Sequence, residues 1–401
     1  SGVHRDLHSF PTRRSSDLGD QGVARGGGWS HRLDLVRASS RAKVKRDQKL
    51  DTTGLRIVLA PEYPAVIPSS LNLDPRVSAA IEAGVDWLAR AQEPDGHWDG
   101  TKWGGLRESN FDKGITGLAL MALISAGQTR IYGRHRACVD KAIKWLCAGM
   151  DQKGNLAPGL MMYHHAIPLV ALLDASGEIP ADDATAATVK RALGYMLDCQ
   201  NKGKAWRYWP RDGQSDISVT AWCVMALDRA RDAKLEVPKE AWDGVSAFLE
   251  SVTDPKTGVV GYAEPPTTEH PLPPYQVYSM AACAANIKMP LGIEKKDKHM
   301  PQLKGLVMQN LPTDKHEGLD EPFFYYWFHA THAIHAMGGK DWDKWRKQLH
   351  EVVLPMQRQD ADPKLKGSWP HEGMHHFGTA GGDVVSTAFA VLTLAEEAER
   401  D

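Results

Sequence analysis

The sequence lacks a dominant charge of either sign and a cysteine framework. Its 401 residues carry 48 Lys and Arg against 50 Asp and Glu, a formal net charge of −2 at pH 7. Nucleic acid is therefore not indicated as a partner. The five cysteines are odd in number and lack the paired spacing of metal or disulfide sites, so we expect buried free thiols. They are Cys138, Cys147, Cys199, Cys223 and Cys283.

An apolar run long enough to cross a membrane is also missing. The longest stretch without Asp, Glu, Lys or Arg lies near residues 154–173, and it contains Asn155, two prolines and two histidines. A membrane-spanning helix needs about 20 mostly apolar residues. We therefore expect no transmembrane segment, and nothing in the sequence indicates a compartment.

The first 18 residues differ in character from the rest of the chain. Residues 1–50 hold 11 Lys and Arg against 5 Asp and no Glu. Within them, residues 1–18 end in Pro-Thr-Arg-Arg-Ser-Ser-Asp-Leu and resemble a translated sequencing adapter. We expect them to be an artefact outside the fold.

Residues 19–65 are expected to be the severed tail of an upstream domain that is missing from this chain. Arg25-Gly-Gly-Gly-Trp29 and Thr53-Gly-Leu-Arg56 resemble the C-terminal end of formylglycine-generating, sulfatase-modifying domains. Leu55 replaces that family's usual phenylalanine, and residues 1–75 contain no cysteine to match its active thiols. The alternative is a flexible basic linker with one short strand at Leu55–Leu59. Prolines then indicate an extended linker over residues 66–75.

Residues 76–400 contain a repeated unit of a polar-faced helix, a glycine-bearing turn and an apolar helix. Residues 85–98 align without a gap with residues 143–156, and the alignment places Gly96 opposite Gly154. Further copies follow, and six units span this region at roughly 54 residues each, within the range of helical repeats. A glycine after each outer helix fits a turn that needs positive φ.

The apolar helices predict the architecture. They are expected at residues 112–126, 162–175, 216–232, 275–287, 323–337 and 383–397. Polar-faced helices alternating with apolar ones indicate an outer ring covering a buried inner ring. We therefore predict an all-α fold, an α6/α6 toroid with Trp98, Trp206 and Trp369 at corresponding places. The alternative is an open solenoid, which the absence of polar end repeats disfavours.

Two turns carry a family resemblance. Gln92-x-x-x-Gly96-x-Trp98 is a full Gln-Trp motif of the kind seen in squalene and oxidosqualene cyclases, and Gly367-Ser-Trp369 is a partial one. The whole of residues 76–400 resembles the prenyltransferase and squalene-cyclase repeat superfamily. The run at residues 207–220 is similar to its uncharacterised repeat proteins. The resemblance implies the toroid fold and leaves the activity open.

The catalytic motifs of these enzymes are incomplete in this chain. Class II cyclases use Asp-x-Asp-Asp-Thr, whereas the nearest text here is Ala181-Asp-Asp-Ala-Thr185, which reads better as a helix start. Protein prenyltransferases bind zinc through Asp-x-Cys, whereas Asp216-Ile-Ser218 has a hydroxyl in place of the thiolate. We therefore assign no metal site and no cofactor, and we leave open whether the protein is an enzyme.

Three aspartates occupy one level of the inner ring. Superposing the apolar helices places Asp112, Asp216 and Asp383 together, each four residues before a threonine at Thr116, Thr220 or Thr387. Aspartate is a good helix N-cap, so helix initiation explains each one alone. In a toroid the inner-helix starts also face one mouth, so the same residues are candidate catalytic or ligand-binding groups.

Histidines and aromatic residues concentrate near this level. His165 and His329 are candidate acid–base groups. The candidate ligand-binding residues are His164, Trp206, Tyr208, Trp209, Tyr325, Tyr326 and Trp327. Satisfied buried histidines and ordinary core packing are the alternative interpretations. Aromatic walls suit sugar stacking and carbocations equally.

Two classes of function remain open. The first is a binding toroid that holds a small-molecule, lipid or glycan ligand of apolar or mixed character at the mouth formed by the inner-helix N-termini. The second is an enzyme, either an isoprenoid cyclase or an α6/α6 glycan lyase or glycosidase. A deep apolar cavity would favour isoprenoids, and a shallow polar groove would favour glycans or peptides.

Overall fold

A computed structural model describes residues 21–25, 41–45, 73–106, 111–176, 184–293, 297–314, 323–359, 362–371 and 376–398. The chain divides into two compact units, residues 1–62 and 63–401. In the first unit, β1 (Gln21–Arg25) pairs antiparallel with β2 (Arg41–Lys45). This strand pair was not predicted from the sequence. The expected strand at Leu55–Leu59 and the whole of residues 1–18 lie outside the described residues.

The second unit is built from helices. Its described part contains α1 (Pro75–Ala91), α2 (Asp112–Ser125), α3 (Arg136–Ala148), α4 (Tyr163–Ala175), α5 (Ala184–Cys199), α6 (Ile217–Asp232), α7 (Lys239–Ser251), α8 (Pro274–Lys288), α9 (Met300–Gln309), α10 (Phe324–Met337), α11 (Lys340–Val353) and α12 (His376–Ala395). Short 3-10 turns follow at Gly100–Trp103, Leu354–Met356 and Glu396–Ala398. No described helix combines the length and hydropathy that a membrane crossing requires.

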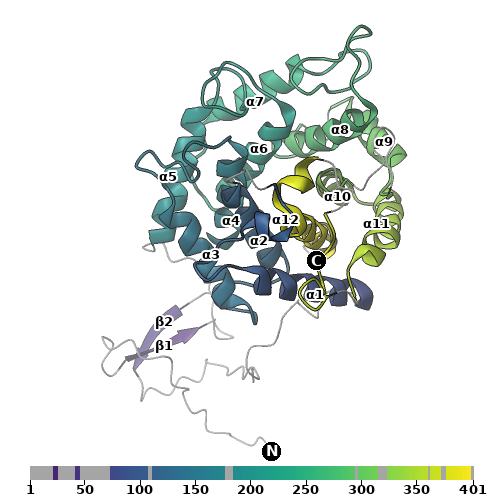
Figure 1. The fold of residues 1–401 in the computed structure, drawn as a ribbon. Helices are drawn as coiled ribbons and strands as arrows, with labels where there is room; N and C mark the ends of the chain where they lie inside the picture. Colours follow the sequence, from purple (N-terminus) through teal and green to yellow (C-terminus); the bar gives the residue numbers. More distant parts are fainter. Residues whose placement is uncertain are drawn as a thin grey trace, which may run out of the picture. The chain divides into compact units, whose positions relative to one another are not determined.

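These helices form two concentric rings (Figure 1). The even-numbered helices lie inside and the odd-numbered ones outside. Each inner helix packs on the next, and α12 packs on α2, which closes the ring. The predicted α6/α6 toroid is confirmed, and the open solenoid is excluded.

The outer helices follow the expected amphipathic pattern. In α11, Trp345, Leu349 and Val353 are buried at a spacing of four residues, whereas Lys347 is exposed. Such a stripe covers one side of a helix and lets it lie on the inner ring. The inner helices are surrounded on every side, so α2 and α4 are apolar around their whole circumference.

The turns between the rings repeat the same hydrogen bonds. The indole N–H of Trp98, Trp206 and Trp369 donates to an outer-helix carbonyl at 2.7–2.8 Å. The backbone N–H of each tryptophan donates to the threonine predicted at the shared level. In the second repeat, Leu156 N–H donates to His165 Nδ1 instead. The predicted register of the three threonines is therefore confirmed, and His165 takes the place of the threonine in the second repeat.

Glycine is needed in these turns for two reasons. Gly96 has a φ of +111° and Gly367 a φ of +94°, backbone conformations that other residues rarely adopt. A Cβ on Gly96 would also lie 2.5 Å from the Lys141 carbonyl oxygen, and one on Gly367 would lie 2.4 Å from the Ala83 carbonyl oxygen. Each turn thus approaches the backbone of the neighbouring outer helix directly.

One inner helix starts earlier than predicted. The sequence pattern placed its beginning at residue 383, whereas α12 begins at His376 and is interrupted at Gly382, which has φ 58° and ψ −151°. The glycine allows a short additional helical segment before the kink. Asp383 therefore follows a kink inside α12, and the residues before it do not form a plain loop.

Glutamine side chains join neighbouring repeats. The amide of Gln92 donates to Gly96 O in its own turn and to Cys138 O of α3. The amide of Gln357 does the same with Gly367 O and with Ala80 O of α1, at 3.0 and 2.8 Å. This last bond connects the end of the repeat array to its beginning.

We expect Gln357→Leu to lower the free energy of unfolding by about 1–2 kcal/mol, because it removes two buried hydrogen bonds and takes the side-chain donor away from Gly367 O. Urea denaturation followed by circular dichroism measures the change. Gln152→Leu is the control, since Gln152 is exposed in the equivalent region of the second repeat and should shift stability by less than about 0.5 kcal/mol. Equal effects of the two substitutions would contradict a role in ring closure.

Candidate functional site

The N-terminal mouth, meaning the end of the toroid at which the inner helices begin, contains the three predicted aspartates. Each has a basic partner from the turn before its helix. Asp112 Oδ2 lies 3.9 Å from His97 Nε2, and Asp216 Oδ2 lies 3.6 Å from Arg207 Nε. Asp383 contacts Arg358 and His371. At the shared level, the aspartates of the inner helices thus contact basic residues of the preceding turns.

The three aspartates differ in how fully they are paired. Asp383 accepts from Arg358 Nη1 through Oδ2, and from the backbone N–H and Nδ1 of His371 through Oδ1. Asp112 is half-buried in the first turn of α2, where burial raises its pKa and His97 opposes this rise. Phe111 is the N-cap residue of that helix and makes no side-chain capping bond. The capping interpretation therefore applies to Asp216, the N-cap of α6.

Asp216 is the least satisfied of the three. Its Oδ1 accepts from Val219 N–H at 2.8 Å, and the side chain is completely buried. Its Oδ2 has no hydrogen-bond partner among the described residues, and neither does Arg207 Nε. Burial raises the pKa of Asp216 to about 6, although the Val219 N–H and Arg207 oppose this rise. The carboxyl therefore changes between its neutral and its charged form near pH 6.

Tyrosine hydroxyls surround this carboxyl. Tyr163 donates to Ser218 Oγ, which also contacts the Tyr325 hydroxyl. The Tyr208 and Tyr262 hydroxyls lie 2.6 Å apart. Burial raises the pKa of Tyr163 and Tyr325, so both hydroxyls stay protonated. The cluster offers several hydroxyl donors around one acidic group.

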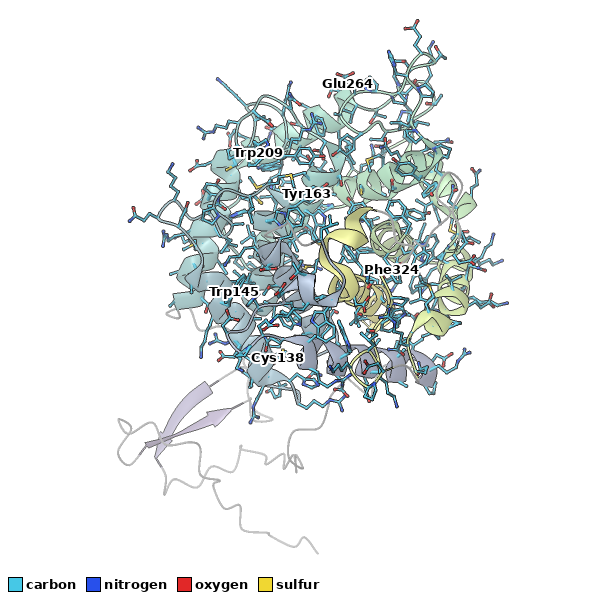
Figure 2. All side chains as sticks on the ribbon, viewed as in Figure 1. Cys138, Trp145, Tyr163, Trp209, Glu264 and Phe324 are labelled. Carbon is cyan, nitrogen blue, oxygen red and sulfur yellow. The ribbon has the colours of Figure 1, made fainter. Side chains whose placement is uncertain are left out.

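Arg207 forms the outer side of the same cluster. Its guanidinium carbon lies 5.3 Å from the ring centre of Tyr208 and 6.0 Å from that of Tyr262. Tyr208 and Tyr262 are half-buried, whereas Trp209 is 49% exposed. Figure 2 shows Trp209 farther from the middle of the rings than Tyr163. The mouth here has an aromatic edge above a buried polar interior.

Several predicted ligand-binding residues lie elsewhere. Trp206 is 1% exposed and packs between the rings, since its indole N–H is bonded to α5. Tyr326 is fully buried and its hydroxyl donates to Val307 O and Asn310 O on the outer side. Trp327 is fully buried beside Phe324. These three side chains do not reach the mouth, so the expectation of one continuous aromatic wall is corrected.

The predicted histidines have different environments. His165 bonds the backbone through both ring nitrogens, to Leu156 N–H and Ala192 O, and it acts structurally. His164 stacks on Phe111 with ring centres 4.8 Å apart, and burial lowers its pKa to about 4. His329 is fully buried, and its Nε2 has no partner among the described residues. Burial lowers the pKa of His329 to about 3, so it is neutral.

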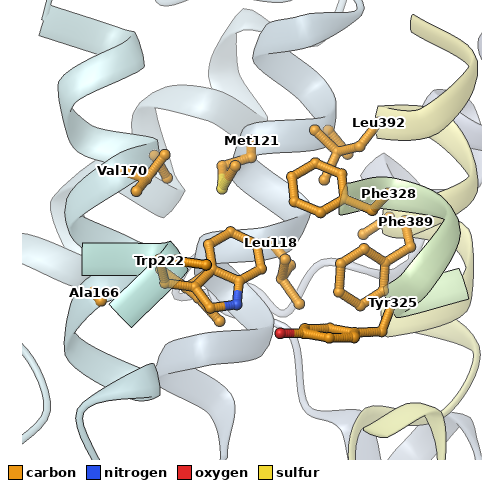
Figure 3. Close-up of a cluster of buried hydrophobic side chains, with 14 of the residues drawn as sticks. Leu118, Met121, Ala166, Val170, Trp222, Tyr325, Phe328, Phe389 and Leu392 are labelled. Carbon is orange, nitrogen blue, oxygen red and sulfur yellow. The ribbon is translucent and has the colours of Figure 1, made fainter. Parts of the chain in front are cut away.

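Aromatic side chains fill the axis of the inner ring (Figure 3). Trp222 stacks on Phe328 with ring centres 5.3 Å apart, and Phe328 packs on Phe389 at 5.6 Å. Tyr325 packs on Phe389 at 6.4 Å. All four residues are at least 94% buried. These side chains occupy the place in which a deep apolar cavity would lie.

No group of three or more His, Cys, Asp or Glu side chains among the described residues is placed to hold a metal ion. Ser218, which stands where zinc prenyltransferases have cysteine, contacts two tyrosines instead.

Four residues of this cluster were not singled out as site candidates from the sequence: Tyr163, Arg207, Ser218 and Tyr262. Weak signals for two of them exist. Tyr163 directly precedes the two predicted histidines, and Tyr262 occupies the tryptophan position of the fourth repeat. Neither signal indicates that the two tyrosines meet around Asp216, because that contact joins separate repeats.

Comparison with solved structures identifies similar folds. The type II terpene cyclase MstE from Scytonema matches with a TM-score of 0.54 and 15% identity, over 80% of this chain and 98% of that one. The α-1,6-mannanase from Salegentibacter sp. HEL1_6 matches with a TM-score of 0.55 and 9% identity, over 80% and 98%. A Clostridium perfringens α-amylase also matches, with a TM-score of 0.55 and 9% identity, over 80% and 98%.

The fold is an α/α toroid. These identities are too low to carry an activity across, so the likeness concerns architecture alone. Neither family models nor curated proteins match the sequence. The chemistry has to be argued from the side chains of this toroid.

Proposed function

We propose that this toroid binds a polyhydroxylated, glycan-type ligand at its N-terminal mouth, over Arg207, Tyr208 and Tyr262. The supporting observation is the incomplete pairing between Asp216 Oδ2 and Arg207 Nε, which lie 3.6 Å apart. Buried polar atoms without partners are rare and costly. The ligand would lie over the guanidinium of Arg207, whose side chain is 25% exposed, and the charge of Asp216, buried beneath it, would orient this guanidinium.

The surrounding groups suit the same ligand class. Hydroxyls of Tyr163, Tyr208 and Tyr262 supply donors and acceptors, and aromatic faces stack on the apolar faces of sugars. The exposed indole of Trp209 extends this surface outward. Among the toroids of similar fold, the mannanase has been determined with α-1,6-mannotriose.

An isoprenoid cyclase is the second candidate. It is favoured by one feature, the Asp216 carboxyl, whose pKa burial raises to about 6 and which lies close to an aromatic layer. Such an acid could protonate an alkene. MstE, of similar fold, has been determined with geranylgeranyl dihydroxybenzoate. Against this candidate, Trp222, Phe328 and Phe389 occupy the axis in which a long hydrocarbon would have to fold.

Calorimetric titration distinguishes the candidates. We expect saturable binding of α-1,6-mannotriose or a related oligosaccharide, weakened about tenfold or more in Asp216→Asn and in Tyr262→Phe, since each loses part of a buried polar contact. Tyr195→Phe is the matched control, because the Tyr195 hydroxyl bonds Asn155 of an outer turn. Binding of geranylgeranyl dihydroxybenzoate with no carbohydrate binding would reject the glycan proposal.

A further inference from the structure

The opposite end of the toroid contains a cavity of its own. It has a volume of about 580 Å³ and lies at the C-terminal mouth, meaning the end at which the inner helices terminate. Residues near the ends of α2, α4, α6 and α12 line it, together with the middle of α10. The volume is within the range of small-molecule sites. The aromatic residues on the axis separate this cavity from the N-terminal mouth.

The floor of this cavity is apolar. It consists of Met121, Leu173, Met225, Phe328 and Leu392. Figure 3 shows Met121, Phe328 and Leu392 toward one end of the axial cluster and Tyr325 toward the other. The Phe328 ring is held by stacking on Trp222, so the floor is rigid. Such a floor accepts the hydrocarbon part of a ligand.

The rim of the cavity carries more acidic than basic groups. Its ionisable residues are Asp174, Arg229, Asp232, His332 and Glu396. Arg229 Nε lies 2.9 Å from Asp174 Oδ1, so these two charges compensate each other. Asp232 and Glu396 add two further carboxylates.

Glu396 is buried and contacts His332 Nδ1 at 2.9 Å and His335 Nδ1 at 3.2 Å. Burial would raise the pKa of Glu396, but the charge and hydrogen bonds of these histidines outweigh it and hold the pKa well below its usual range. The group is therefore an anion at neutral pH.

The backbone adds to this negative field. Helices α2, α4, α6 and α12 all end at this mouth, and each helix C-terminus carries a partial negative charge of roughly half an electron. Aligned helix ends and the carboxylate of Asp232 act in the same direction, whereas His332 and His335 compensate the charge of Glu396. A cation near Asp232 would gain from the helix ends and from this carboxylate.

We propose that the C-terminal mouth is a second binding site, which takes an organic ammonium ion with an apolar body. The hydrocarbon body lies on the apolar floor, and the charged group faces the exposed carboxylate of Asp232 at the rim. This site is independent of the function proposed for the N-terminal mouth.

The test uses three probes of matched shape on the full chain. Benzyltrimethylammonium is the cation, neopentylbenzene its uncharged isostere, and benzenesulfonate an anion of similar size. We expect calorimetry to show saturable binding of the cation and no saturable binding of the other two probes. Equal or tighter binding of the uncharged or anionic probe, or no saturable binding of the cation, would overturn the proposal.

Substitutions of residues that line the cavity test whether the cation binds there. Asp232→Asn should weaken cation binding roughly fivefold or more, as expected for loss of a nearby charge. Asp228→Asn is the matched control, since Asp228 stands one turn earlier on α6, pairs with Arg231 and does not line the cavity. Leu392→Trp should fill the cavity and abolish binding, and Ser125→Trp does the same from α2 if the first variant fails to fold. Unchanged binding in Asp232→Asn and in a folded tryptophan variant would place the cation elsewhere.

Discussion

Replacing Asp383 by asparagine is expected to lower the free energy of unfolding by about 3–5 kcal/mol, the usual loss when one partner of a buried ion pair is removed. The same change at Asp216 is expected to raise it at pH 7 by roughly 1–3 kcal/mol. The two residues occupy equivalent positions in their repeats. The opposite signs follow from their different partners.

The loss at Asp383 comes from Arg358 and His371. Both are largely buried, and both direct hydrogen bonds at the Asp383 carboxylate. Asparagine keeps the shape but removes the negative charge, so the largely buried guanidinium of Arg358 loses its ion pair with this carboxylate.

The gain at Asp216 comes from removing an unfavourable charge. Its pKa of about 6 in the folded chain lies above the value of about 3.9 for an exposed aspartate. The folded state therefore binds the extra proton between about pH 4 and 6, and wild-type stability falls as pH rises through this window. Asparagine does not ionise, so the variant does not lose stability as the pH rises. Its side-chain oxygen can still cap α6 by accepting from Val219 N–H.

Urea denaturation of both variants from pH 4 to 8 tests this contrast. The stability difference between Asp216→Asn and wild type should grow from pH 4 to about 6 and then stay constant. Unchanged urea dependence of unfolding would show that the unfolded state is unaffected. Destabilisation of Asp216→Asn at pH 7 similar to that of Asp383→Asn would mean that Asp216 and Arg207 form a favourable ion pair in solution.

Truncation of the neighbouring residues Trp206 and Trp209 is expected to change stability by very different amounts. Trp206→Ala should lower the free energy of unfolding by about 3–5 kcal/mol, as for other large aromatic residues removed from a core. Trp209→Ala should change it by less than about 0.5 kcal/mol. Trp206 is 1% exposed and bonded to Met196 O, whereas Trp209 is 49% exposed.

Thermal and urea denaturation measure the stability of both variants, and calorimetry with α-1,6-mannotriose measures binding. If the glycan proposal holds, Trp209→Ala weakens binding although it leaves stability unchanged. A stable Trp206→Ala protein with weakened ligand binding would restore the original expectation that Trp206 faces the ligand.

The repeat turns could be predicted from the sequence. The glycine at residue 96 predicted a positive-φ turn after the first outer helix, and Trp98 was expected at the same place as Trp206 and Trp369; the φ of +111° at Gly96 and the indole bond of Trp98 to Leu88 O confirm both. The prediction succeeds because these contacts are local, within about ten residues. The shared level of Thr116, Thr220 and Thr387 is also confirmed, through bonds that join each threonine to a tryptophan 14 to 18 residues away in its own repeat.

The candidate site could be predicted only in part. Spacing placed Asp112, Asp216 and Asp383 at one level, but their partners decide what each can do. Ser218, Tyr163 and Tyr325 meet although 55 and 107 residues separate Ser218 from the two tyrosines. No periodic pattern records such a contact, because it depends on how the inner helices are rotated against one another.

The sequence by itself indicated the two rings, because fully apolar helices that alternate with amphipathic ones are buried best inside a ring of the latter. Only the tertiary structure decided which side chains point to the axis, the mouth or the space between rings. Trp206, Tyr208 and Trp209 are near neighbours in the chain, yet one is in the core, one borders the acidic cluster and one is exposed. All three are aromatic. Their surroundings differ because helices from different repeats pack around them, and the local sequence does not encode that packing.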